Sequence, residues 1–154
     1  MTIAGLTSAA QTLSVAPVAP GLFSTDQSGH GQGAVLIANT NTLVAPIGSI
    51  PGRESRPAKP GEFITIFCTG LGAVTPSLAN GEPGKNNTTL DKPSVTIDGA
   101  PATLEFSGIA PGFIGLDQVN VQVPAGMRTA NDMPVVLTIG GKQSNTVTIA
   151  VSRS

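Results

Sequence analysis

Apolar and polar residues alternate over short stretches in the second half of the chain. Val119, Val121 and Val123 alternate with polar residues, and a second alternating stretch runs from Val147 to Val151. A period of two places every second side chain on the same side of a β-strand, so that one side can be buried while the other meets solvent. These stretches predict two half-buried strands.

Two glycine-containing dipeptides separate further alternating runs. Asp98-Gly99 lies between the runs 95–97 and 104–106, and Gly140-Gly141 follows the run Val135–Ile139. Such dipeptides supply the positive φ values that tight hairpin turns require. We expect a β-hairpin at each position.

Three strands are predicted upstream, at Thr12–Ala16, Ala34–Ala38 and Glu62–Thr69. The last of these carries bulky apolar residues on both sides, as a central strand does. In total the chain contains about eight strands with turn signals between them, the pattern of an all-β sandwich of two packed sheets. The length of 154 residues suits a single domain, with a core over about residues 12–151.

One nine-residue stretch occurs twice in similar form. APGLFSTDQ (residues 19–27) returns as APGFIGLDQ (residues 110–118). Proline presets φ at the second position of a turn and glycine accepts positive φ at the third, so each copy predicts a type II turn that leads a strand into the core. Either the chain has two related halves, or two strands enter the core in the same way; the poorly matching flanks favour the second. We expect these structural anchors, with both glycines at positive φ: Gly21, Leu22, Phe23, Gly112, Phe113 and Ile114.

Charged residues are sparse, at 11% of the chain, with a formal net charge of −1. No basic stripe is present, so the sequence argues against a nucleic-acid partner. No stretch reaches the ~18 apolar residues of a membrane span. Low charge with many Thr, Ser, Asn and Gly residues is typical of extracellular β-proteins. Composition alone leaves both an exported segment and a cytoplasmic protein open, and the expectation of a secreted or cell-surface location comes from the family resemblance described below.

The polar connection Ala73–Pro93 is the candidate functional loop, because it is long and rich in Pro and Gly. It gathers oxygen-bearing side chains, which calcium prefers, without the spacing of an EF-hand. A solvated polar loop is favoured over a calcium site. The weak calcium candidates are Asn80, Glu82 and Asp91, with Asn86 and Asn87 nearby.

No catalytic constellation is visible. Cys68 is the only cysteine, which rules out an intrachain disulfide, and His30 is the only histidine. Cys68 shares its side of the strand with Ile64 and Ile66, so we expect a buried, inert thiol. His30 lies between glycines and predicts a solvated loop residue. We expect no enzymatic activity and no cofactor.

Five blocks follow one another along the chain: SVAPVAPGLFS, GHGQGAVL, PAKPGEFITIFCTGLGAVTPS, KPSVTIDGAPATLEFSGIAPGFIGLDQVNVQVPAGM and MPVVLTIGGKQSNTVTIAV. In this order they resemble the uncharacterised C-terminal domain of large secreted proteins from acidobacteria such as Solibacter. The resemblance spans about Leu13–Val151 and implies an exported, immunoglobulin-like module without assigned catalytic residues. Two positions depart from the pattern: Cys68, where a small residue is usual, and Asp117, where an aromatic residue is common.

These observations favour a non-enzymatic extracellular structural, attachment or assembly module of a larger secreted protein. The alternative is a module that binds carbohydrate or another cell-surface ligand, although Trp and Tyr, the usual sugar platform, are absent. The partner is expected to be a protein or a cell-surface component. Thr12–Ala16 and Asn145–Val151 carry no charge, so either terminal strand could self-associate through an open edge.

Overall fold

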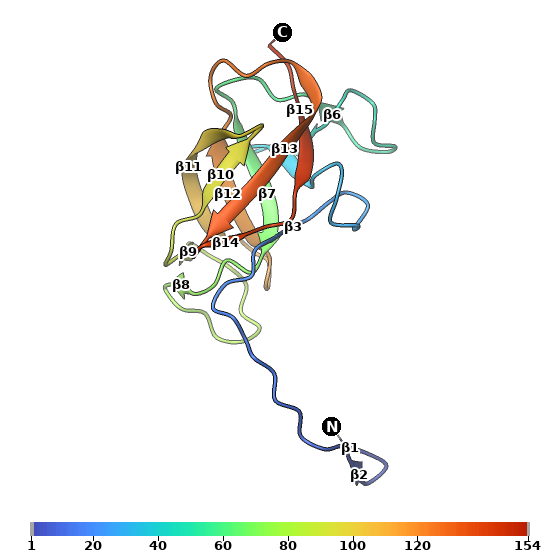
Figure 1. The fold of residues 1–154 in the computed structure, drawn as a ribbon, viewed down its shortest axis with the longest axis vertical. Coiled ribbons are helices and arrows are strands. Elements are labelled where there is room, and N and C mark those ends of the chain that lie inside the picture. Colours follow the sequence, from blue (N-terminus) through green and yellow to red (C-terminus); the bar gives the residue numbers. More distant parts are fainter. Residues whose placement is uncertain (1, 154) are drawn as a thin grey trace.

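The computed structural model describes residues 2–153, which form strands, turns and loops and contain no helix (Figure 1). The all-β prediction is confirmed. The strands are β1 (Thr2–Ile3), β2 (Leu6–Thr7), β3 (Gly21–Leu22), β4 (Val35–Ile37), β5 (Leu43–Val44), β6 (Ser55–Arg56), β7 (Phe63–Thr69), β8 (Val74–Thr75), β9 (Thr88–Thr89), β10 (Ser94–Ile97), β11 (Ala100–Ile109), β12 (Asp117–Gln122), β13 (Ala130–Ile139), β14 (Lys142–Gln143) and β15 (Val147–Val151).

All strands except the β1–β2 pair belong to one curled, mixed sheet. Its main path runs β14-β13-β10-β11-β12-β7-β4-β5-β6, and β15 pairs with β13. The long strand β11 pairs with β10 through its first residues and with β12 through the rest, with an irregularity between Leu104 and Phe106. This irregularity lies within the part of β11 that pairs with β12, shortly after β11 has left β10, and an extra residue at such a point bends the strand.

The sheet curls far enough for its two ends to meet. Bridges join Gln32 to Thr148 and Ala58 to Val151. The amide of Gly33 donates to Thr148 O at 2.9 Å. Strand β15 therefore has β13 on one side and the segments beside β4 and β6 on the other. The predicted open edge at Asn145–Val151 is wrong, because these bridges occupy it.

The alternating stretches bury the side chains that the sequence indicates. Strands β12 and β15 place their valines and isoleucine in one continuous apolar core. Both predicted hairpins are confirmed. Ile97 pairs with Ala100 across Asp98-Gly99, and Ile139 pairs with Lys142 across Gly140-Gly141, with all four turn residues at positive φ.

The predicted opening strand at Thr12–Ala16 is wrong. This segment pairs with no other described residue, and Leu13 and Val15 are 84% and 90% exposed. In Figure 1 the chain runs away from the sheet over this part and ends in the small β1–β2 hairpin. The first backbone bond to the body is Ala19 N to Gly70 O, at 2.9 Å. The apolar alternation of this segment does not lead to a strand, because no other described strand lies beside it.

Only part of the anchor prediction for the repeated stretch holds. Leu22 is buried, and Gly112 has a φ of +81° in a turn closed by Phe113 N and Ala110 O at 3.1 Å. Gly21 does not adopt positive φ, because it is a strand residue paired with Thr69. A type II turn therefore forms only in the second copy.

The other three predicted anchors are not core residues. Phe23, Phe113 and Ile114 are exposed large apolar side chains. Phe23 follows the inward-facing Leu22 along an extended backbone, and the alternation of a strand turns it outward. Phe113 and Ile114 lie in the turn itself, beyond the edge of the core.

Candidate functional site

Strand β7 is central, as the sequence predicts, with β12 on one side and β3 and β4 on the other. Its residues Ile64, Ile66 and Cys68 are buried in the core. The alternation then directs Phe63, Thr65 and Phe67 to the outer side of the sheet.

Amide side chains lie beside these outward residues. The register of β12 against β7 pairs Gln118 with Phe67, Asn120 with Thr65 and Gln122 with Phe63. Since Val119 and Val121 are buried, the three amide residues share the outer side with the phenylalanines.

Three adjoining grooves on this outer side contain all five phenylalanines of the chain. Their volumes are about 380, 500 and 450 Å³. The first two share Asn39, Gln118 and Asn120, and the last two share Leu36 and Phe67. We call this surface the aromatic face, and its principal residues are Phe23, Leu36, Phe63, Phe67, Phe106, Phe113, Gln118 and Asn120.

Asn120 organises the polar centre of the aromatic face. Its Oδ1 accepts hydrogen bonds from Thr65 Oγ1 at 3.0 Å and from Gln118 Nε2 at 2.9 Å. These two bonds fix the orientation of the Asn120 amide, and its Nδ2 donates to no other described residue. The side chain is therefore held in place with two N–H donors available to a ligand.

Backbone hydrogen bonds hold the two exposed phenylalanines of the repeated stretch. Phe23 N donates to Phe67 O at 3.2 Å, and Phe23 O accepts from Ala34 N at 2.8 Å. Phe113 O accepts from Gly84 N at 2.8 Å. Both rings therefore project from fixed backbone positions on either side of Phe67.

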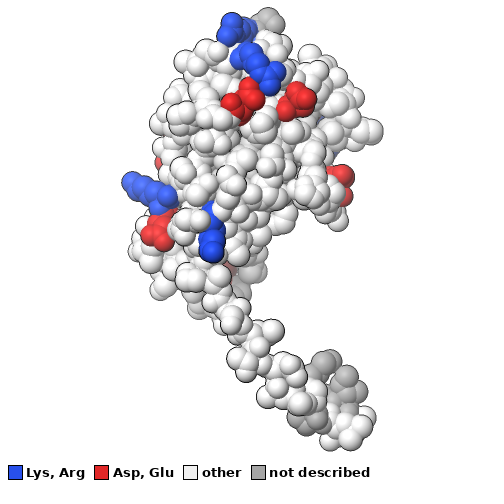
Figure 2. Space-filling view, viewed as in Figure 1, with Lys and Arg blue, Asp and Glu red and all other residues white. Residues whose placement is uncertain are grey.

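The aromatic face is almost free of charge. Among the residues that line the three grooves, only Glu105 and Arg53 are charged, and they belong to different outer grooves. Figure 2 shows the same sparse, scattered charge on the side of the molecule that it presents. The described surface around the five phenylalanines therefore offers little charge.

The three weak calcium candidates lie at the surface of the polar loop. Asn80, Glu82 and Asp91 are exposed, and Glu82 accepts from Ala79 N at 3.1 Å. Asn87 is buried, and it orders the loop by donating to Pro76 O at 2.6 Å. Across residues 2–153, no cluster of three or more His, Cys, Asp or Glu side chains could hold a metal ion.

Cys68 is buried, as predicted, and lies opposite Asp117 in the β7–β12 register. Burial raises the pKa of the thiol far above its ordinary value, and the nearby Asp117 carboxylate raises it further. Such a thiol is a poor nucleophile because little thiolate forms. His30 is exposed, as predicted for a loop residue.

Asp117 itself is nearly buried and has a defined role. Its carboxylate accepts a hydrogen bond from Leu71 N at 3.0 Å. Burial raises the pKa of this carboxyl, while hydrogen bonds from the Leu71 and Gly70 amides act in the opposite direction. Asp117 therefore fastens the chain where it leaves β7.

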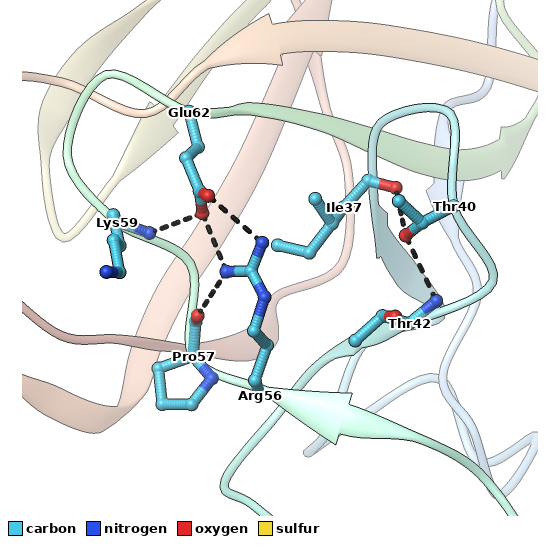
Figure 3. A network of polar contacts seen from close by, with 7 residues as sticks. All are labelled: Ile37, Thr40, Thr42, Arg56, Pro57, Lys59 and Glu62. Atoms are coloured by element: carbon cyan, nitrogen blue, oxygen red, sulfur yellow. Dashed lines mark hydrogen bonds and ion pairs between the residues drawn. The ribbon is translucent and has the colours of Figure 1, made fainter.

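A polar network fixes the other end of β7 (Figure 3). Arg56 Nη1 and Nη2 bind the two oxygens of Glu62 at 2.9 and 3.0 Å, and Lys59 N donates to Glu62 Oε2 at 2.8 Å. The Arg56 hydrogen bond lowers the pKa of Glu62. The strand that carries Phe63 and Phe67 is thus anchored at both ends.

Sequence reasoning did not identify the aromatic face. Its signal was present in the outward positions of β7 and β12, where phenylalanine and amide residues take the places of the charged residues common on solvent-exposed strands.

None of the described residues forms a helix able to span a membrane. Comparison with models of known families, with curated proteins and with solved structures gives no match.

Proposed function

We propose that the chain is a non-enzymatic, extracellular assembly module of a larger secreted protein, with its strands in an immunoglobulin-like arrangement of two packed layers. The sparse charge and the resemblance to the acidobacterial C-terminal domain support an exported module. The curled sheet with one continuous core supports a self-contained unit.

The observation that carries this proposal is the exposed segment Thr12–Ala16. Leu13 and Val15 point apolar side chains into solvent, and no described residue pairs with the backbone of the segment. No residue from Thr2 to Thr25 is charged. An extended, uncharged segment with unpaired N–H and C=O groups is a template for a second strand.

The partner that fits this segment is the same segment of a second copy. The strands with an unoccupied side, such as β6, β8 and β14, are only two residues long in the described part of the chain. They are too short to hold five residues. Antiparallel pairing centred on Ser14 would place Leu13 opposite Val15 of the second copy, so that the apolar side chains lie together.

Sedimentation velocity ultracentrifugation tests the proposal. Five residues from each copy bury far less than a standard interface, so we expect self-association only at concentrations on the order of 100 μM. Replacing both Leu13 and Val15 with Asp should abolish it, because like charges would face each other across the pair.

Ile47→Asp is the matched control, since Ile47 is also an exposed apolar residue but lies in the loop after β5. It should associate as the wild type does. A wild type that stays monomeric at millimolar concentration, or a Leu13/Val15 double variant that still associates, would refute the proposal.

A further inference from the structure

We propose that the aromatic face is a binding site for a neutral carbohydrate chain. The site lies on β4, β7, β11 and β12, with Phe23 after β3 and Phe113 in the turn before β12, and it includes none of the residues Thr12–Ala16. Binding there does not depend on self-association, and the two properties can fail separately.

The shape of the site favours an extended ligand. The three grooves adjoin through shared residues, with Asn120 between the first and second and Phe67 between the second and third. A ligand that followed them would pass Phe63 and Phe106, cross Asn120, and then reach Phe113, Phe67 and Phe23. Several linked sugar rings fit this description better than one compact small molecule.

The chemistry of the site matches both the apolar faces and the hydroxyl-bearing rim of a sugar ring. A pyranose ring has apolar C–H faces, and these are attracted to the negative face of an aromatic ring. Its rim carries hydroxyl groups, which pair with amide donors and acceptors. The fixed amide of Asn120, with Gln118 beside it, supplies such groups between the phenylalanine rings.

The same features count against other partners. An anionic or cationic ligand would find one Arg and one Glu at separate grooves and no cluster of opposite charge. A protein strand could not pair with this surface, because β7 and β12 already have neighbours on both sides. A wholly apolar partner would bury the central amides without partners, which is costly. A neutral polyhydroxylated chain avoids all three difficulties.

Isothermal titration calorimetry on the full chain tests the inference, with cellohexaose, xylohexaose and mannohexaose as neutral probes and a galacturonic acid hexamer as the charged comparison. We expect at least one neutral hexamer to bind, and the charged hexamer to bind at least tenfold more weakly.

Phe113→Ala should weaken binding of that neutral hexamer at least tenfold, because the ring contacts the ligand directly. The control is Leu90→Ala, which removes an exposed apolar side chain that lines none of the three grooves, and it should change affinity less than twofold. Both residues are exposed, so thermal unfolding midpoints should stay close to the wild-type value.

Three outcomes would overturn the inference. One is the absence of binding by all three neutral hexamers at millimolar concentration. The second is binding that a Phe23→Ala/Phe113→Ala double variant leaves unchanged, which would place the sugar elsewhere. The third is loss of self-association in that double variant without any sugar binding, which would make the face a protein interface. Loss of association in the Leu13/Val15 variant bears only on the assembly proposal.

Discussion

Phe23 and Phe113, which belong to the two copies of the repeated stretch, each line a groove that Phe67 also lines. The two copies approach β7 from opposite sides, since Leu22 and Asp117 both pair with Cys68. They do so at different positions of the nine-residue stretch, so the copies are not equivalent by symmetry. What they share is an exposed aromatic ring delivered to the same outer surface of the sheet.

The two glycines of the repeated stretch should respond differently to alanine. Gly112 has a φ of +81° and open space around the position of an added Cβ, so Gly112→Ala strains only the backbone. We expect a loss of about 1 kcal/mol in the free energy of unfolding. At Gly21 the added Cβ meets Thr69 Cγ2 at an ordinary 3.5 Å, so Gly21→Ala should change stability by less than about 0.5 kcal/mol.

Urea denaturation of both variants provides the measurement. Equal losses in the free energy of unfolding for Gly21→Ala and Gly112→Ala would contradict the difference in φ between the two glycines.

The Cys68 thiol should react with a disulfide reagent only as fast as the protein opens. It is fully buried, and its raised pKa leaves little thiolate at neutral pH. Labelling should accelerate as urea approaches the unfolding midpoint. Ser49→Cys introduces an exposed thiol as an internal reference and should add one rapid phase. Rapid modification of Cys68 in the native wild type would contradict its burial.

The raised pKa of Asp117 makes the free energy of unfolding depend on pH in a known direction. Its raised pKa means that the folded state binds the proton more tightly than the unfolded state. Protonation therefore stabilises the fold, and this contribution is fully present below the unfolded pKa and is lost as pH rises through the folded pKa. Asp117→Asn removes the ionisation while keeping an acceptor for Leu71 N.

The stability difference between Asp117→Asn and the wild type should therefore shift in favour of the variant as pH rises from about 3.5 to 7, the interval that begins near the ordinary carboxyl pKa. Asp117→Ala should be destabilised by about 1–3 kcal/mol, since the buried Leu71 amide loses its acceptor. A difference between Asn variant and wild type that stays constant over this range would show that the carboxyl pKa is not raised.

Alternation along the chain was enough to predict the core strands, because burial on one side of a sheet imposes a period of two that the sequence displays directly. Val119, Val121 and Ile149 illustrate this. Alternation could not predict whether Thr12–Ala16 has a neighbour, because pairing depends on which strand edges remain open after the sheet curls. Those edges are closed by bridges such as Ala58 to Val151, between residues far apart in the sequence.

Prediction from the sequence has the same limit for the candidate site, the aromatic face. Phe106 and Phe113 come close to Phe63 and Phe67 only through the register of β11, β12 and β7. In the sequence alone, an aromatic residue that follows a turn glycine, such as Phe113 after Gly112, is as compatible with burial in the core as with exposure on the surface. The distinction depends on which side of the sheet each residue reaches, and Leu22 and Phe23 are on opposite sides although they are adjacent.

The most direct test of the assembly role is amide hydrogen exchange, followed by mass spectrometry, over residues 12–16 as protein concentration increases. These amides have no partner in the described part of a single chain, so they should exchange freely in dilute protein. We expect their exchange to slow at concentrations where the wild type associates, while the Leu13→Asp/Val15→Asp variant stays fast throughout. Free exchange of residues 12–16 at every concentration, including those at which association occurs, would contradict it.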